Sequence, residues 1–495
     1  MRQVEELAAT VSGRARLLSG SLLEEVVNIT EWPHAVIGEF AGDYLKLPDQ
    51  LLETIMVHHQ RYFPVERKDA SKKESSISSD NIMPYFVAVA NNDLEPAQRH
   101  IKMGNERVLR ARLADGKFFY FDDQKRKLTE RMDELEQLTF QKGLGSYKDK
   151  VERLKKLSEK VSRDLSLPAE TSVCLERAVE LCKLDLVTNL VGELPELQGY
   201  VGSWYAELEG EPPQVVSAIA SHYAPRHPEE PIPADEIGCL AAALDKIDHL
   251  SGLFALGKKP SGSRDPFALR RNAQGLIDIA VDGLKAHPLN LTELFDYLLD
   301  HFEPVMTGGK KKLDRQEVGK QLHDFVVQRL RGKLLDMKFA REIVDSVLGA
   351  RDPLTDVADV VTRSRCLEEL VKADQDMKLI RAGVRVGNIL KPDSPEEVNE
   401  SDFSEPMEKE LWTAFKEFRS RWQSNGFRAP QTEDEYKDLT KELTPLAPSI
   451  DKFFEDVMVN DEDKKKRNVR HAILKNIDEY FKTIADFHKL QPLLP

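Results

Sequence analysis

Cysteine and long apolar runs are both scarce in this 495-residue chain, and each scarcity excludes a class of protein. The four cysteines form no CxxC pair and no zinc-finger spacing, which argues against a structural metal site. No apolar run approaches the length that spans a bilayer, and the N-terminus lacks the apolar core of a signal peptide. We therefore expect a protein of a reducing compartment, with neither a membrane span nor a disulfide framework.

An excess of basic residues is also missing. The formal net charge of −14 argues against a protein coated with basic surface, although it leaves room for local basic patches that bind RNA. Hydrophobic residues make up 41% and charged residues 32%, a balance typical of folded, helix-rich proteins. The length is too great for one core and indicates roughly two to four domains.

The first part of the chain, from about Leu22 to Phe121, has the pattern of a mixed α/β domain. Pro84–Ala90 is an apolar, aromatic and β-branched run that predicts a strand. Thr54–Val57 and Tyr62–Val65 are further candidate strands. Lys68–Asp80 is polar and rich in serine and lysine, which predicts a loop.

From Leu128 onward the apolar residues recur with the period of a helix. Tyr147–Val161 places four of them on one face. Further helices are predicted at Leu175–Val191, Val215–His222, Glu236–Leu253, Ala268–Leu284 and from about Asp463 to the end of the chain. Asp393–Glu405 reads as an acidic linker. The predicted fold is mainly α and multidomain, with a mixed α/β N-terminal part.

The stretch Met103–Asp115 carries three arginines on a predicted helix. They are Arg107, Arg110 and Arg112, and we expect the helix to pack through Val108, Leu109 and Leu113. Taken alone, such a segment is typical of a solvated amphipathic helix. Three other strings accompany it: HHQRYFPV at His58–Val65, GSRDPFALRR at Gly262–Arg271 and VMVNDEDKKKRNVR at Val457–Arg470.

Together and in this order, these strings resemble the β subunit of the bacterial-type, two-subunit glycyl-tRNA synthetase, or the matching half of its fused organellar form. The resemblance runs from about Leu22 to Gln491, and because the family has more sequence before Leu22, we expect an N-terminally truncated chain. It implies three domains: a remnant of an acceptor-side (B3/4-like) tRNA-binding α/β domain at 1–125, a degenerate HD-like helical domain at 126–303, and a helical anticodon-binding domain at 304–495 with a linker near 393–405.

The middle domain invites a metal-phosphohydrolase interpretation. Asp245 and Asp248 lie three apart on one predicted helix, and His222 ends another, so carboxylates and histidine gather as a divalent cation requires. The arrangement resembles the HD-type phosphohydrolases, whose active members carry an adjacent His-Asp pair. At the equivalent helix this chain has Lys183 and Asp185 and no histidine. Too few ligands remain, and Lys183 brings a positive charge to the cation's place, so we predict a degenerate, metal-free scaffold.

Several basic segments could touch RNA phosphates. The loop within Gly257–Arg271 lacks the spacing of a nucleotide-binding loop, and Ser263 and Asp265 should cap a helix that starts near Pro266. In the C-terminal part, Gln328–Leu334 and Arg385–Lys391 place cations beside core residues. There Phe325, Val326, Leu330 and Leu334 should face the core, while Gln328, Arg331 and Lys338 point outward. This part resembles the anticodon-binding domain shared with arginyl-tRNA synthetase.

The tRNA-binding residues that the resemblance implies are Arg107, Arg110, Arg112, Arg264, Arg270, Arg271, Arg329, Arg331, Arg385, Asn388, Lys391, Lys464 and Arg467. The segment from His58 to Tyr62 combines hydrogen-bond donors with an aromatic ring. It suits a surface that binds RNA and equally suits a satisfied network at a strand end. Both interpretations stay open at this point.

Nothing in the chain resembles the ATP-binding core of a class II synthetase, so we expect this chain alone to be inactive. The resemblance implies the tRNA-binding, non-catalytic part of a glycine–tRNA ligase, which makes glycyl-tRNA through glycyl-adenylate. ATP and magnesium would be used by a catalytic α subunit or a fused α region, no cofactor would be bound by this chain, and higher-order assembly would run through the α part. We expect a cytoplasmic protein in a bacterium, or a plastid or mitochondrial one in a plant. The alternatives are an active metal-dependent phosphohydrolase and a free-standing RNA-binding protein derived from the synthetase.

Overall fold

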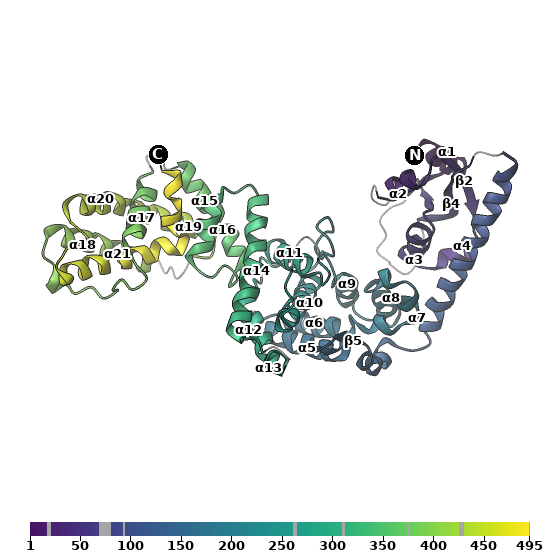
Figure 1. Cartoon of the computed structure of the whole chain (residues 1–495), viewed down its shortest axis with the longest axis horizontal. Coiled ribbons are helices and arrows are strands. Elements are labelled where there is room, and N and C mark those ends of the chain that lie inside the picture. Colours follow the sequence, from purple (N-terminus) through teal and green to yellow (C-terminus); the bar gives the residue numbers. More distant parts are fainter. Residues whose placement is uncertain are drawn as a thin grey trace. The chain divides into compact units, whose positions relative to one another are not determined.

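The computed structural model describes residues 1–16, 21–68, 81–92, 95–260, 265–308, 312–373, 377–424 and 430–494. The chain packs as two compact units: Met1–Ala224 with Pro233–Asp245, and Pro225–Ile232 with Lys246–Pro495 (Figure 1). Helices dominate both units, which confirms the prediction of a mainly α, multidomain protein. The three domain ranges stay a prediction. Among the described residues, no helix combines the length and the apolar character that a membrane crossing needs.

The first unit begins with a small sheet and continues into helices. Its elements are α1 (Arg2–Thr10), β1 (Gly13–Ala15), α2 (Ser21–Ile29), β2 (His34–Glu39), η1 (Gly42–Lys46), α3 (Asp49–Glu53), η2 (Thr54–His59), β3 (Phe63–Arg67), β4 (Ile82–Ala90), α4 (Glu95–Asp123), η3 (Leu128–Glu136), β5 (Thr139–Gln141), β6 (Gly145–Ser146), α5 (Tyr147–Asp164), α6 (Ala169–Leu181), η4 (Leu184–Val187), α7 (Asn189–Glu193), η5 (Pro195–Leu197), α8 (Tyr200–Leu208) and α9 (Pro213–Ser221). The division between the units falls inside α10 (Glu236–Ala255).

The sheet is antiparallel throughout, with the strand order β1-β3-β4-β2. Strands β3 and β4 confirm the predictions at Tyr62–Val65 and Pro84–Ala90, and Phe63 pairs with Val87 in their register. Apolar side chains of α1, α2 and the sheet form one core. The sheet is therefore a packed layer rather than an isolated hairpin.

The predicted strand at Thr54–Val57 is wrong, because these residues begin the π-helix η2. The run is short, continuous and apolar, a pattern that fits a buried helix as well as a buried strand. It directly continues α3, and all four of its side chains are buried. The polar loop predicted at Lys68–Asp80 lies outside the described residues after its first residue.

Helix α4 is 29 residues long and contains the whole of the predicted helix Met103–Asp115. Leu109 and Leu113 are buried as expected, whereas Val108 is exposed, so its predicted packing role is wrong. The helix buries one narrow face, and Val108 lies beside that face. Figure 1 shows α4 running from the sheet to α7, and it contacts both β2 and α7.

The last residue of α4 joins this helix to the helical body. Asp123 is buried, and its carboxylate accepts hydrogen bonds from the backbone N–H groups of Asn189 (3.0 Å) and Leu190 (2.9 Å) at the start of α7. Arg131 donates to the backbone carbonyl of Asp123 at 2.7 Å. Asp123 thus caps one helix from the end of another.

Helix α5 shows how closely sequence pattern and structure agree in the helical body. It begins with a capping box, in which Ser146 and Asp149 each accept from the other's backbone N–H. The four apolar residues expected on one face, Val151, Leu154, Leu157 and Val161, are all buried. The short β5–β6 hairpin before α5 was not predicted.

The second unit is helical in its described part. Its elements are α11 (Leu269–Asp278), η6 (Ile279–Gly283), α12 (Leu291–His301), α13 (Glu303–Gly308), α14 (Arg315–Asp336), α15 (Arg341–Ala350), α16 (Val357–Ala373), α17 (Lys378–Ile389), η7 (Glu400–Asp402), α18 (Pro406–Ser424), α19 (Glu433–Leu443), η8 (Thr444–Leu446), α20 (Ala447–Asp456), α21 (Lys464–Ile484) and η9 (Phe487–Leu493). Helix α17 packs against α21 and against η9, and η9 supplies four of the residues that line the candidate site.

Two predicted helix starts in this unit had different outcomes. Helix α21 begins as expected, with Asp463 as its N-cap and its apolar stripe buried. The helix expected from Pro266 begins at Leu269 instead, because Ala268 has a left-handed backbone conformation (φ 55°). Asp265 still caps it, whereas Ser263 lies outside the described residues.

Candidate nucleic-acid interface

The three arginines of α4 lie on its exposed side. Arg107, Arg110 and Arg112 are exposed while Leu109 and Leu113 anchor the opposite face. Arg112 forms a loose ion pair with Glu193, with 3.6 Å between Nη1 and Oε1. An exposed pair of this kind contributes little to stability, so these cations can exchange their partners for phosphates.

The segment from His58 to Tyr62 fits the structural network better than an RNA-stacking surface. The Tyr62 ring is buried and stacks on Phe86 with 4.7 Å between ring centroids. Its hydroxyl donates to Asn105 at 3.0 Å. His59 contacts Glu196 at 2.6 Å. A base therefore cannot reach the Tyr62 ring without opening the fold.

The residues of the HD-like site form a buried charge cluster in the first unit. Lys183 Nζ lies 2.8 Å from Asp245 Oδ1, and Lys150 Nζ lies 3.1 Å from the same oxygen. Lys183 also sits over the ring of Tyr223, 3.8 Å from its centroid. One buried carboxylate thus receives two ammonium groups.

Electrostatics keep this cluster ionised. Burial lowers the pKa of Lys183, but the Asp245 carboxylate more than offsets that effect and leaves the pKa above its ordinary value. Burial raises the pKa of Asp245, yet Lys150 and Lys183 outweigh it and hold that pKa well below its usual range. The carboxylate and its two cations are therefore mutually compensating charges.

The remaining HD-like residues have structural partners. Asp185 accepts hydrogen bonds from the backbone N–H groups of Gly199 (2.5 Å) and Gly202 (3.2 Å), where α8 begins. Burial raises the pKa of Asp185 to about 6. His222 is buried, with its Nδ1 2.6 Å from the carbonyl of Ile219, and Asp248 is buried on α10. Among the described residues, no group of three or more histidine, cysteine, aspartate or glutamate side chains could hold a metal ion.

A second group of predicted cations lies at α11 and α14. Asp265 accepts from the backbone N–H groups of Arg270 (3.1 Å) and Arg271 (3.2 Å), so it neutralises this helix start. Arg329 lies over the Phe325 ring at 4.8 Å, and its pKa is lowered by burial and then by Arg270. Phe325 is half-buried, whereas Val326, Leu330 and Leu334 are fully buried as predicted. Arg264 lies outside the described residues.

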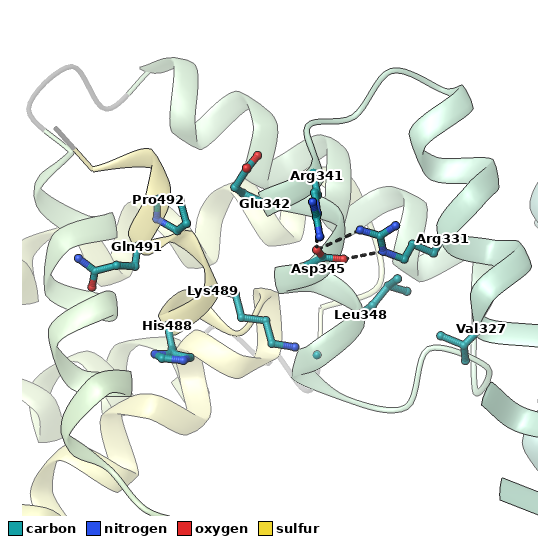
Figure 2. Close-up of a pocket in the computed structure, with 11 residues that line it drawn as sticks. Val327, Arg331, Arg341, Glu342, Asp345, Leu348, His488, Lys489, Gln491 and Pro492 are labelled. Atoms are coloured by element: carbon teal, nitrogen blue, oxygen red, sulfur yellow. Dashed lines mark hydrogen bonds and ion pairs between the residues drawn. The ribbon is translucent and has the colours of Figure 1, made fainter. Parts of the chain in front are cut away.

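A pocket of about 810 Å³ lies in the C-terminal part, between α14, α15 and η9 (Figure 2). Its lining residues are Val327, Arg331, Arg341, Glu342, Asp345, Leu348, Gly349, His488, Lys489, Gln491 and Pro492. Asp345 lies between two arginines: Arg331 binds it through two bonds of 2.7 and 3.1 Å, and Arg341 approaches within 3.5 Å. The Arg331 guanidinium holds the pKa of the Asp345 carboxyl below its usual range.

Helix α17 lies outside the pocket lining but holds two residues that line it. Asn388 donates to Gln491 at 2.8 Å and also hydrogen-bonds His488, so it fixes two lining residues. Arg385, three residues earlier, pairs with Asp451 at 2.9 Å and lies over the Phe454 ring, and so has a structural partner. Of the predicted residues, Arg331 therefore lines the pocket itself, whereas Asn388 lies outside the lining and contacts the pocket through Gln491 and His488.

Three further predicted residues lie outside the pocket lining. Lys391 and Lys464 are exposed, and Arg467 is half-buried with its guanidinium donating to the carbonyl of Asp461 at 2.9 Å. Lys464 and Arg467 belong to the first turn of α21, and Lys391 follows α17. Their role in binding RNA stays a prediction, as it does for the other predicted cations.

Comparison with known proteins now decides the family. The family model described as "Glycyl-tRNA synthetase beta subunit" matches residues 1–349, and the one described as "DALR anticodon binding domain" matches residues 379–493. The chain belongs to the glycyl-tRNA synthetase β-subunit family. This confirms the resemblance drawn from the sequence motifs.

Bacterial relatives of this β-subunit-family chain agree along nearly its whole length. The glycine–tRNA ligase β subunit of Clostridioides difficile is 34% identical over 489 residues, which are 99% of this chain and 67% of the relative. The β subunits of Geotalea uraniireducens (36% identical, 99% and 67%) and Acaryochloris marina (35%, 98% and 67%) are similar. The chain thus spans about two thirds of the length of these relatives.

The β-subunit pocket includes residues that the sequence analysis missed. Arg341, His488, Lys489 and Gln491 all line it, yet none was singled out. Arg341 follows a predicted helix, and the other three lie in a short, irregular C-terminal segment with no motif of its own. The one available signal was their place inside the stretch that resembles the anticodon-binding domain.

Proposed function

We propose that this chain binds glycine tRNA as the non-catalytic part of a glycine–tRNA ligase, and that the pocket of Figure 2 holds part of the anticodon loop. The pocket carries the proposal, because it places Arg331, Arg341, Lys489 and the Gln491 amide around one hollow. Proteins recognise RNA loops by unstacked bases on guanidinium planes and by hydrogen bonds to base edges. Its volume of about 810 Å³ lies in the range of ligand-binding pockets.

The charge pattern of the pocket supports an RNA loop over a free anion. The Asp345 carboxylate holds the two guanidinium groups in place and offers an acceptor to base amino groups. Glu342 adds a second carboxylate. A site for phosphate alone would gain nothing from these acceptors, whereas a base edge presents both donors and acceptors.

The catalytic chemistry belongs, in this proposal, to a catalytic α subunit or a fused α region. That part would bind ATP and magnesium, form glycyl-adenylate and carry any higher-order assembly. This chain would hold no cofactor, and Lys183 would occupy the place of the HD-type metal. It would work in the cytoplasm of a bacterium, or in the plastid or mitochondrion if the source is a plant.

The test is tRNA binding by fluorescence anisotropy at several salt concentrations. Arg341→Ala removes a side chain that is 76% exposed and should weaken tRNA affinity about 3- to 10-fold. It should also lower the salt slope, which is the slope of the logarithm of the binding constant against the logarithm of the salt concentration, by roughly one. Lys441→Ala on α19, 75% exposed and outside the pocket lining, is the matched control and should change neither.

Gly349→Ala tests the same pocket without removing a charge. A Cβ at this position would collide with the end of the flexible Lys489 side chain, so the ammonium group must move while the helix gains propensity. We expect weaker tRNA binding with unchanged or higher thermal stability. Wild-type affinity in both Arg341→Ala and Gly349→Ala, with both proteins folded, would exclude this pocket as the RNA site.

A further inference from the structure

One apolar side chain stands out on the C-terminal part of the molecule. Met458 is 74% exposed, and within the described residues of 377–494 no other large apolar side chain is exposed. Its neighbours Val457 and Val459 are both buried. We call the segment Val457–Asp461 the Met458 loop. It exposes the thioether side chain of Met458 to solvent, while the two flanking valines are buried.

The Met458 loop is held in place by a buried ion-pair network. Arg470 donates to the backbone carbonyl of Met458 at 2.7 Å and to the Asp461 carboxylate at 2.9 Å. Arg470 and Glu408 are both buried, and Arg470 Nε donates a hydrogen bond to Glu408 Oε1 at 2.6 Å. Arg470, one member of this buried ion pair, therefore fixes the conformation of the Met458 loop through its hydrogen bonds to Met458 and Asp461. Met458 is thus presented on a rigid support.

A second network joins the Met458 loop to the end of α17. His471 Nε2 lies 3.0 Å from the Asn460 side-chain oxygen, and its Nδ1 lies 3.1 Å from Ser394 Oγ. Ser394 in turn accepts from the backbone N–H of Lys391 at 2.9 Å. Arg467 donates to the backbone carbonyl of Asp461, the last residue of the Met458 loop, at 2.9 Å. These hydrogen bonds link Arg467 directly, and the backbone of Lys391 through Ser394 and His471, to the Met458 loop.

We propose that the Met458 loop is the surface on which an unpaired nucleotide of a bound RNA rests, with Lys391 and Arg467 holding the flanking phosphates. The inference depends on the proposed RNA-binding function and assigns a residue that the sequence analysis did not single out. A polarisable thioether packs well against an aromatic ring face, so it suits a base of any identity. The negative charge of Asp461 is already paired with Arg470, which leaves the cations available to phosphates.

A protein partner fits this surface less well. A specific protein interface buries roughly 800 Å² on each side around an apolar centre, and a single exposed methionine provides no such centre. RNA needs only a stacking surface and positive charge. The experiment below distinguishes between RNA and a protein as the partner of this surface.

The experiment measures binding of glycine tRNA and of the catalytic α part by four variants of the chain. Met458→Ala should weaken tRNA affinity about 5-fold with an unchanged salt slope, because the lost contact is uncharged. Lys391→Ala should weaken affinity and lower the slope by roughly one. Met458→Leu should retain affinity within about 2-fold, and Val173→Ala, which also removes an exposed apolar side chain, should have no effect.

Each failure has its own signature. If the wild-type chain does not bind tRNA, the proposed function fails and this inference fails with it. If tRNA binds and Met458→Ala binds equally well, the inference alone is wrong. If Met458→Ala weakens association with the α part and leaves tRNA affinity intact, the Met458 loop is a protein contact, which also overturns the proposal. A photo-crosslinker at position 458 should map to an unpaired nucleotide, and a crosslink confined to a paired stem would contradict it.

Discussion

The charge cluster around Asp245 predicts how the free energy of unfolding changes when its charges are removed one at a time. Asp245→Asn keeps the shape of the side chain and removes its charge, which takes from the buried Lys183 the carboxylate that lies 2.8 Å away. The Lys183 side chain is 1% exposed, so water cannot replace the carboxylate. Breaking one buried pair costs about 3–5 kcal/mol, and we expect a loss of stability in this range.

The second variant makes the prediction specific to charge. Lys183→Met added to Asp245→Asn removes the Lys183 cation that the single substitution leaves without its carboxylate, and places an apolar chain over the Tyr223 ring. The double variant should therefore be more stable than the single Asp245→Asn protein, by about 1–2 kcal/mol. Hydrogen exchange of amides in α5 and α6, read by mass spectrometry, measures the opening free energy where the cluster lies.

A partly exposed ion pair of Lys155, on the same helix α5 as Lys150, supplies the control. Lys155 pairs with Glu180 at 3.3 Å, with both side chains more than a quarter exposed, so Lys155→Met should change stability by less than about 1 kcal/mol. Refutation is simple to recognise. If Asp245→Asn exchanges like Lys155→Met, or if Lys183→Met destabilises the Asp245→Asn protein further, the cluster is not a set of mutually compensating charges.

Three further predictions follow from the same structure. Purified chain alone should show no glycine-dependent exchange between ATP and pyrophosphate but should restore tRNA charging when the catalytic α part is added; exchange by the chain alone would contradict the proposed division of labour. Elemental analysis after dialysis should find no stoichiometric manganese, iron or zinc, because the proposal places Lys183 where an HD-type enzyme would hold its metal, and retained metal would refute this. The pKa of Asp185 is raised to about 6, so its contribution to stability is present below pH 4 and is lost as the pH rises through 6. Asp185→Asn should remove this pH dependence of the free energy of unfolding, which is on the order of 3 kcal/mol. Urea unfolding of both proteins between pH 4 and 7 measures it, and the reasoning fails if the free energies of the two proteins change with pH in parallel.

Sequence pattern predicted the parts of this fold whose stability is local. Helix α5 and the stripe of α21 could be located because apolar side chains repeat every helical turn and a capping residue stands at the start. The apolar run at Thr54–Val57 has no such period, and tertiary packing decided its π-helical form. The candidate pocket could be predicted only in part, because Arg331 and Lys489 are 158 residues apart in the sequence. Their proximity depends on how α15 and η9 pack, which no local pattern contains.

The hydrogen bonds of Asp123 fix one end of helix α4 to the helical body of the first unit. With 29 residues at about 1.5 Å each, α4 is roughly 43 Å long. A small change of angle at one end of a rod of this length moves its other end by several times the shift at the fixed end. The positions of Arg107 and Arg110 relative to α7 therefore depend on a buried carboxylate at the far end of their helix.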